Sequence, residues 1–170
     1  MLAAVILEKT AEKAMIAAKK CEKADLIELR LDYTEDLNDL KLKTLIEKCS
    51  KPVIVTNRKI AEGGFFKGNE EKRVAVLKAA ISLGADYVDI EFSSDKNTIE
   101  YLIKNKKNTK IIASYHNFKE TPGKIKNTYG KIKNLNPDII KIATKANSIV
   151  DNFRIFELIK SANKENQKII

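Results

Sequence analysis

The sequence predicts an α/β fold in which helices cover a parallel sheet. Short apolar runs alternate with segments of helical periodicity, as in repeated βα units. The runs start about every 27 residues, an interval that suits one strand and one helix. Of the 170 residues 44% are hydrophobic, so the chain can bury a sizeable core. We predict a single domain spanning residues 1–170.

Seven segments are predicted as strands because each is a short apolar run bounded by polar or turn-forming residues. They are residues 2–7, 25–31, 52–58, 86–92, 110–116, 138–144 and 168–170. The intervening helices carry apolar residues three or four positions apart, most clearly in 10–21 and 70–83. Gly84 supplies a helix stop after the second of these.

The number of units predicts an incomplete barrel. Eight units at this interval would need roughly 220 residues, the size of a (β/α)8, or TIM, barrel. This chain has six units and the start of a seventh strand. Closing a barrel removes the sheet edges, and six and a fraction units are too few to do so. We therefore expect a truncated TIM barrel and interpret the chain as a fragment of a longer enzyme.

Composition excludes several classes of protein. The 32 basic and 23 acidic residues give a net charge of +9, but the lysines are dispersed among Glu and Asn on helix-like segments. That pattern is typical of a solvated face, so we predict no nucleic-acid partner. No run approaches the ~20 apolar residues of a membrane span, and no signal peptide follows Met1. We expect a cytoplasmic protein without a membrane partner.

The two cysteines do not predict a metal site. Cys21 and Cys49 each lie a few residues before a predicted strand, in equivalent places, and the only histidine is distant. Two cysteines and one histidine cannot build a structural zinc site. Both cysteines are predicted to pack at helix ends.

Polar residues alternate with apolar ones along five of the predicted strands. If the apolar set, for example Val53 and Val55, faces the helices, the polar set points into one lumen. Ion pairing alone is the better explanation for any single pair. Five strands together favour an active site at the carboxyl ends of the strands. The polar set is Glu28, Arg30, Thr56, Arg58, Asp89, Glu91, Ser114, His116 and Lys141.

Lys141 and His116 are the candidates for chemistry. Lys141 lies inside an apolar run, and His116, the only histidine, closes another such run 25 residues earlier. Desolvation is one way in which a lysine becomes a neutral nucleophile. The pair therefore predicts Schiff-base chemistry with an adjacent proton carrier. Arg30 and Arg58, two of only four arginines, share the inward parity and offer a rigid fork for hydroxyl or carboxylate oxygens.

The segment 59–69 contains a glycine pair, Gly63 and Gly64, directly after Glu62. Adjacent glycines permit unusual backbone angles and movement, which suits a loop that closes over a pocket. An ordinary turn is the alternative. Glu62 is close enough to Arg58 in sequence to reach the same mouth, where a carboxylate could orient an imidazole.

An ordered set of short motifs resembles the type I 3-dehydroquinate dehydratases, the Schiff-base dehydratases of the shikimate pathway. The resemblance covers the whole chain and implies a (β/α)8 barrel, commonly a homodimer, without metal or organic cofactor. It also implies a small-molecule substrate, 3-dehydroquinate. The motifs are Glu28-Leu-Arg30-Leu-Asp32, Thr56-Asn-Arg58 with Glu62-Gly-Gly, Val88-Asp-Ile-Glu91, Ser114-Tyr-His116 and Lys141-Ile-Ala143.

The resemblance implies a role for each candidate residue. Lys141 would form an imine with the ring ketone, and His116 would take a proton from the neighbouring carbon. The protonated imidazole would then deliver a proton to the departing tertiary hydroxyl, giving 3-dehydroshikimate and water. Glu62 would hold the imidazole in place. The substrate ring would be bound by Glu28, Arg30 and Arg58.

Two departures from the family pattern affect the expected activity. The family's carboxylate-clamping arginine and a later serine and glutamine come from its seventh and eighth units, which are absent here. The first strand offers Ile6 and Leu7 where the family often has a small polar residue. We therefore expect weak substrate binding and low or no turnover by this chain, and an active full-length parent.

Two alternative functions belong to other classes. A class I aldolase would share a lysine on the sixth barrel strand, but aldolases typically use Tyr, Asp or Glu as proton carrier, whereas His116 is the candidate here. The non-enzymatic alternative is a partial barrel kept for assembly, whose open edges pair with another copy of the chain. Measuring the size of the particle in solution would separate this case from a monomer.

Overall fold

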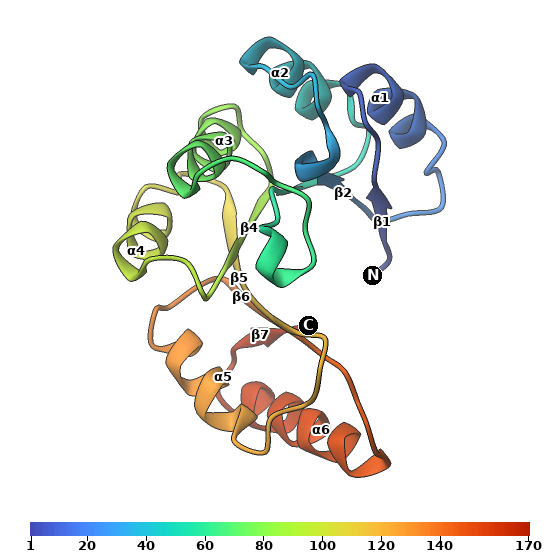
Figure 1. Cartoon of the computed structure of the whole chain (residues 1–170). Helices are drawn as coiled ribbons and strands as arrows, with labels where there is room; N and C mark the ends of the chain where they lie inside the picture. Colours follow the sequence, from blue (N-terminus) through green and yellow to red (C-terminus); the bar gives the residue numbers. More distant parts are fainter.

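The computed structural model describes all 170 residues and contains one parallel sheet with strand order β1-β2-β3-β4-β5-β6-β7. β1 pairs only with β2, and β7 only with β6. The strands lie inside an arc of helices that stays open between its two ends (Figure 1). The predicted truncated barrel is thus confirmed as a curled half-barrel. The strands are β1 Ala3–Ile6, β2 Leu26–Arg30, β3 Val53–Thr56, β4 Tyr87–Glu91, β5 Lys110–Asn117, β6 Ile139–Thr144 and β7 Lys168–Ile169.

Six α-helices and two short 3-10 helices connect the strands. Four of the α-helices begin after a residue whose side chain accepts a hydrogen bond from a backbone N–H three positions on, namely Thr10, Asn38, Asn69 and Asp95. These caps explain why the helices begin where they do. The α-helices are α1 Ala11–Lys19, α2 Asp39–Lys48, α3 Glu70–Ser82, α4 Lys96–Lys104, α5 Ile125–Lys133 and α6 Ile149–Lys164; the 3-10 helices are η1 Leu31–Tyr33 and η2 Ile60–Glu62.

All seven predicted strands are present, and β3 shows the most informative difference at its end. The predicted strand ran to Arg58, but β3 ends at Thr56. The carbonyl of Asn57 accepts a hydrogen bond from Arg73 of α3, and the Asn57 side chain donates one back to the Arg73 carbonyl. Because α3 binds Asn57 in this way, the chain leaves the sheet one residue before Arg58.

An aspartate directly before every second strand fixes the register of a strand pair. Asp25 accepts a hydrogen bond from the Leu2 amide at 2.7 Å, which ties β2 to β1. Asp86 binds the Val53 amide at 2.8 Å, and Asp138 binds the Ile111 amide at 2.8 Å. Amides at or just before the amino ends of β1, β3 and β5 thereby gain a partner. A shift of one residue would exchange the two faces of the strand, so these contacts protect the inward parity.

The apolar parity of the strands packs against the helices, as expected. Val55, Val88 and Ile90 are fully buried in a cluster that also contains Leu45 of α2 and Leu77 of α3. Cys21 and Cys49 pack against this cluster, which confirms their predicted helix-end packing. A second cluster joins β5 and β6 to α5 and α6.

The floor of the lumen is also apolar. Leu26, Ile54 and Ile112 form a small buried cluster, and Tyr87 and Ile139 pack against it. These residues have the inward parity, but they lie at the amino ends of their strands. The charged residues of the same parity therefore stand above an apolar floor, toward the carboxyl ends.

The outer surface of α6 is apolar over part of its length. Ile149, Phe153 and Phe156 are exposed there, and the two phenylalanine rings meet edge to face.

No helix in the structure combines the length and the apolar character that crossing a bilayer requires.

Packing between α3 and the sheet should contribute strongly to the stability of the chain. Leu77 is 0% exposed, whereas Leu40 on α2 is 73% exposed. We expect Leu77→Ala to lower the free energy of unfolding by about 2–5 kcal/mol, because it leaves a cavity in the core. The matched change Leu40→Ala should alter it by less than about 0.5 kcal/mol. Urea unfolding followed by circular dichroism measures both, and equal losses would contradict the assignment of the core.

Candidate active site

Lys141 of β6 points into the lumen and forms ion pairs there. Its Nζ atom lies 3.3 Å from Asp89 Oδ2 and 3.9 Å from Glu28 Oε1. The side chain is 25% exposed. The sequence had suggested an amine shielded among isoleucines. The structure places the isoleucines on the flanking positions of the strand and two carboxylates beside the amine itself.

Asp89 of β4 is the centre of this cluster, although it was not among the residues selected as catalytic or substrate-binding. Its carboxylate is fully buried and accepts hydrogen bonds from Arg58 Nη2 at 2.7 Å and Ser114 Oγ at 2.6 Å. Burial opposes ionisation, but the charges of Arg58 and Lys141 outweigh it and lower the pKa of Asp89 well below its ordinary value. Asp89 therefore joins β5, β6 and the loop that follows β3 through one ionised group.

The other predicted ligand-binding residues lie around this cluster in two groups. Glu28 accepts a hydrogen bond from Thr56 Oγ1 at 2.8 Å and faces Lys141. Arg30 turns instead toward the loop after β2, where Nε and Nη2 donate to Asp32 at 2.9 and 2.8 Å. The structure thus brings Glu28, Arg58 and Lys141 together around Asp89 and places Arg30 at the edge of the mouth.

His116 is held by Glu62. Nδ1 of the imidazole lies 2.9 Å from Glu62 Oε2, and the His116 backbone N–H donates to the same oxygen at 3.2 Å. The Ser93 hydroxyl donates to Oε1. Burial opposes ionisation of Glu62, but the hydrogen bonds from His116 and Ser93 lower its pKa. Because a carboxylate can only accept, Nδ1 carries a proton, and the lone pair of the neutral form of the imidazole lies on Nε2.

His116 and Lys141 share one face of two adjacent strands. Ser114 pairs with Lys141 in the register of β5 and β6, and His116 pairs with Ala143. His116 therefore lies one strand across and two residues further on, which places its Cα about 8 Å from that of Lys141. A small ring bound between the two side chains could meet both.

The glycine pair is required by the backbone geometry of the loop. Gly63 has φ +76°, in the left-handed region, and a Cβ on Gly64 would lie 2.0 Å from the Arg58 carbonyl oxygen. Phe118 covers Gly63, and its ring centroid is 6.1 Å from that of His116. The glycines therefore let the segment carrying Glu62 pass close to Arg58. Closure of this loop over a ligand stays a prediction.

A second buried arginine supports the site from outside the lumen. Arg73 of α3 is 1% exposed, and its Nη1 donates to Glu91 Oε2 at 2.6 Å. The other Glu91 oxygen lies 3.4 Å from Arg58 Nη1. Hydrogen bonds from Arg73 lower the pKa of Glu70 to about 2. Arg73 was not selected from the sequence, because it follows three charged residues on a predicted helix. Only the apolar residues of that helix were expected to be buried.

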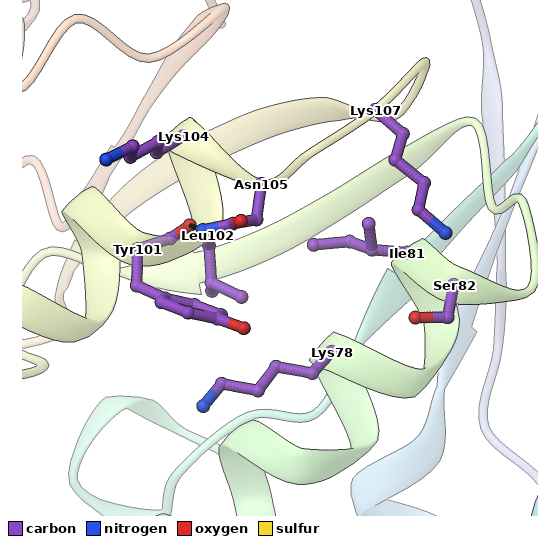
Figure 2. A pocket seen from close by; sticks show the side chains of 8 residues that line it. All are labelled: Lys78, Ile81, Ser82, Tyr101, Leu102, Lys104, Asn105 and Lys107. Carbon is purple, nitrogen blue, oxygen red and sulfur yellow. Dashed lines mark hydrogen bonds between the residues drawn. The ribbon is translucent and has the colours of Figure 1, made fainter.

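Two surface hollows lie apart from Lys141 and His116. One, of about 460 Å³, lies between α3 and α4, where Lys78 Nζ stands 4.4 Å from the centroid of the Tyr101 ring (Figure 2). The other, of about 670 Å³, lies beside Asp32 and Asn57 among the loops after β2 and β3. The site described above is therefore distinct from the groove in Figure 2.

A lysine, a histidine and paired carboxylates at the carboxyl ends of parallel strands place the chain in the class of β/α-barrel proteins with a polar site at that end of the sheet. Comparison with known proteins agrees with this class. The family profile described as type I 3-dehydroquinase matches residues 2–170. The chain belongs to the type I 3-dehydroquinase family, which confirms the resemblance noted in the sequence.

Individual relatives differ in how much of their length the chain covers. A 3-dehydroquinate dehydratase of Methanocaldococcus jannaschii is 40% identical over 175 residues, covering 100% of this chain and 76% of that protein. A chloroplastic bifunctional 3-dehydroquinate dehydratase/shikimate dehydrogenase of Arabidopsis thaliana is 36% identical over 95% of this chain, which spans only 28% of the plant protein. The crystal structure of the Clostridium difficile type I enzyme shows the same fold, with TM-score 0.90, 23% identity and coverage of 99% of this chain and 73% of that one.

The link between Glu70 and Arg73 should make part of the stability depend on pH. A carboxyl whose pKa falls from 4.5 to about 2 on folding stabilises the fold above pH 4.5, and this contribution is lost as the pH falls toward 2. We expect Glu70→Gln to lower the urea midpoint near neutral pH and to converge with the unchanged protein in acid. The matched change Glu157→Gln removes a highly exposed pair with Lys160 and should have little effect at any pH. A Glu70→Gln loss independent of pH would contradict the ionic link.

Proposed function

We propose that this chain carries the active site of a 3-dehydroquinate dehydratase, in which Lys141 forms an imine with the substrate ketone. The observation that supports this most directly is the placement of Lys141 and His116 on one face of adjacent strands, with Glu62 on the far nitrogen of the imidazole. This arrangement offers a nucleophile and a separate proton carrier to one small ring.

The first step would be attack of the Lys141 amine on the ring ketone. Asp89 and Glu28 favour a positive charge on Nζ, and an iminium carries that same charge. The ammonium must first release a proton, after which attack gives a carbinolamine and loss of water gives the iminium. The two carboxylates then stabilise the product of this step as well as its starting state.

His116 would perform both proton transfers of the elimination. Its Nε2 lone pair accepts the proton from the carbon next to the iminium, and the electron pair of that C–H bond forms the double bond of an enamine. The enamine then expels the tertiary hydroxyl and becomes a conjugated iminium. The imidazolium then returns a proton to the tertiary hydroxyl, which leaves as water. Glu62 stabilises the imidazolium between these transfers and fixes the ring orientation through Nδ1. Hydrolysis of the imine releases 3-dehydroshikimate and restores Lys141.

Substrate binding would depend on Glu28, Arg30 and Arg58. Each cation of the mouth is already paired within the chain: Arg30 with Asp32, and both Arg58 and Lys141 with Asp89. A substrate carboxylate would have to compete with these carboxylates. We therefore propose that the isolated chain binds the substrate weakly and turns over slowly, whereas imine formation remains open to it.

Borohydride trapping tests the role of Lys141. We expect incubation with 3-dehydroquinate and borohydride to add the mass of the reduced ligand to the peptide that contains Lys141. Lys141→Ala should abolish this label, and the matched change Lys145→Ala, four residues further along the chain, should leave it in place. Peptide mass spectrometry measures the outcome. Labelling that persists in Lys141→Ala would contradict the proposal.

Substitution of His116 should separate the two stages of the reaction. We expect His116→Ala to keep borohydride trapping at Lys141 but to lower product formation by at least about 100-fold, the usual contribution of general acid–base catalysis. Product is followed by the ultraviolet absorbance of the conjugated enone. If His116→Ala abolished trapping instead, or left turnover unchanged, the imidazole would not be the proton carrier.

A further inference from the structure

We propose that Arg73, on the outer helix α3, is a positioning residue for the active site and sets the reactivity of Lys141 through Glu91, Arg58 and Asp89. The inference rests on the proposed function in taking Lys141 as the nucleophile. Arg73 itself lies outside the lumen and touches neither Lys141 nor His116.

All five N–H groups of the Arg73 guanidinium are used. Nε and Nη2 each donate to Glu70 at 2.8 Å, and Nη2 also donates to Ser94 Oγ at 2.9 Å. Nη1 donates to Glu91 Oε2 at 2.6 Å and to the Asn57 carbonyl at 2.8 Å. A guanidinium with every donor engaged has one orientation. Lysine could not reproduce these contacts.

Two of these contacts fix Arg58 from opposite sides. The Asn57 carbonyl belongs to the peptide unit that leads into Arg58, so its hydrogen bond fixes the backbone there. Glu91 is held by Arg73 through Oε2, while its Oε1 lies 3.4 Å from Arg58 Nη1. Arg58 is closer to Asp89, at 2.7 Å. Arg73 thus shares the charge of Glu91 and leaves Arg58 bound mainly to Asp89.

The charges on these residues determine whether loss of Arg73 raises or lowers the reactivity of Lys141. Without Arg73, Glu91 would keep only Arg58 as a cationic partner and would draw it away from Asp89. Asp89 and Glu28 would then hold the Lys141 ammonium more strongly, and the site would also have lost one positive charge. Both changes favour the protonated amine. A protonated amine cannot attack a carbonyl carbon, so the reactivity of Lys141 should fall.

Trace acetylation of the intact chain measures this reactivity without any substrate. The readout is the ratio of acetylation by acetic anhydride at Lys141 to that at Lys145, determined by mass spectrometry at one mildly alkaline pH. We expect Arg73→Gln to lower this ratio about threefold or more. Arg154→Gln is the matched control, because it also removes an arginine from an i,i+3 pair, on the distant helix α6. That control should leave the ratio unchanged.

A double variant distinguishes positioning from a general structural role. In Arg73→Gln/Glu91→Gln the charge that would draw Arg58 from Asp89 is absent, so the ratio should return to within about twofold of the unchanged protein. A merely structural role predicts a further loss, because a second buried contact has been removed. Arg73→Lys keeps the charge without the fork and should give an intermediate ratio. Circular dichroism melts verify that each variant is folded at the labelling temperature.

The outcomes separate this inference from the proposed function. An unchanged ratio in folded Arg73→Gln, or a double variant below the single one, would overturn the role of Arg73. If Arg73→Gln does not fold, the acetylation ratios of Arg73→Lys and of the double variant are used instead. A ratio in Arg73→Lys equal to that of the unchanged protein, or a double variant below Arg73→Lys, would then overturn the role of Arg73. Absence of borohydride trapping with 3-dehydroquinate in the unchanged chain would instead overturn the proposed function, while the acetylation ratios would still decide the role of Arg73.

Discussion

The structure depends on one buried negative charge, the carboxylate of Asp89. It is fully enclosed and receives Arg58 from the loop that follows β3, Ser114 from β5 and Lys141 from β6. An isolated carboxylate at this depth would be strongly unfavourable, and removal of one partner from a buried pair typically costs about 3–5 kcal/mol. The four strands must therefore keep the curvature that lets these side chains converge. The same requirement fixes the position of the amine proposed as the nucleophile.

Within the lumen, the apolar residues that stabilise the fold and the polar residues of the candidate site lie at different levels along the strands. Its amino-terminal floor is an apolar cluster of Leu26, Ile54 and Ile112, which needs no hydrogen-bond partners. Two residues further along the same strands the inward positions are polar, as at Glu28 on β2 and Ser114 on β5. The aspartates before β2, β4 and β6 bind amides at or just before the amino ends of the preceding strands and thereby hold the register. Because a slip by one residue would turn the charges toward the helices, the site depends on contacts at the opposite end of the sheet.

Much of the fold was predictable from the sequence because it rests on local periodicity. The seven strands follow from short apolar runs, the inward parity of five of them follows from alternation along each run, and helices such as α3 follow from apolar spacing. What could not be predicted depends on contacts between distant residues. Asp89 looked equivalent to its inward neighbours, and only the curvature of the sheet makes it the common partner of Arg58 and Lys141. Arg73 lies on a helix, outside the strand pattern, so alternation carried no information about its contact with Glu91.

The pairing of charges also explains why the same carboxylates can serve both a resting and a reacting site. In the proposed reaction, the ammonium on Lys141 and the iminium formed from it would carry the same positive charge at nearly the same place, so Asp89 and Glu28 would not need to move between the two states. Only the neutral amine and the carbinolamine between them lack this stabilisation. The orientation of these groups is set in advance by Arg58 and Thr56, which bind Asp89 and Glu28 respectively. Such a fixed environment favours charged intermediates without reorganisation of the protein, which is the main way in which an enzyme site lowers a barrier. The charges that hold the half-barrel together are therefore the same charges that the proposed reaction would use.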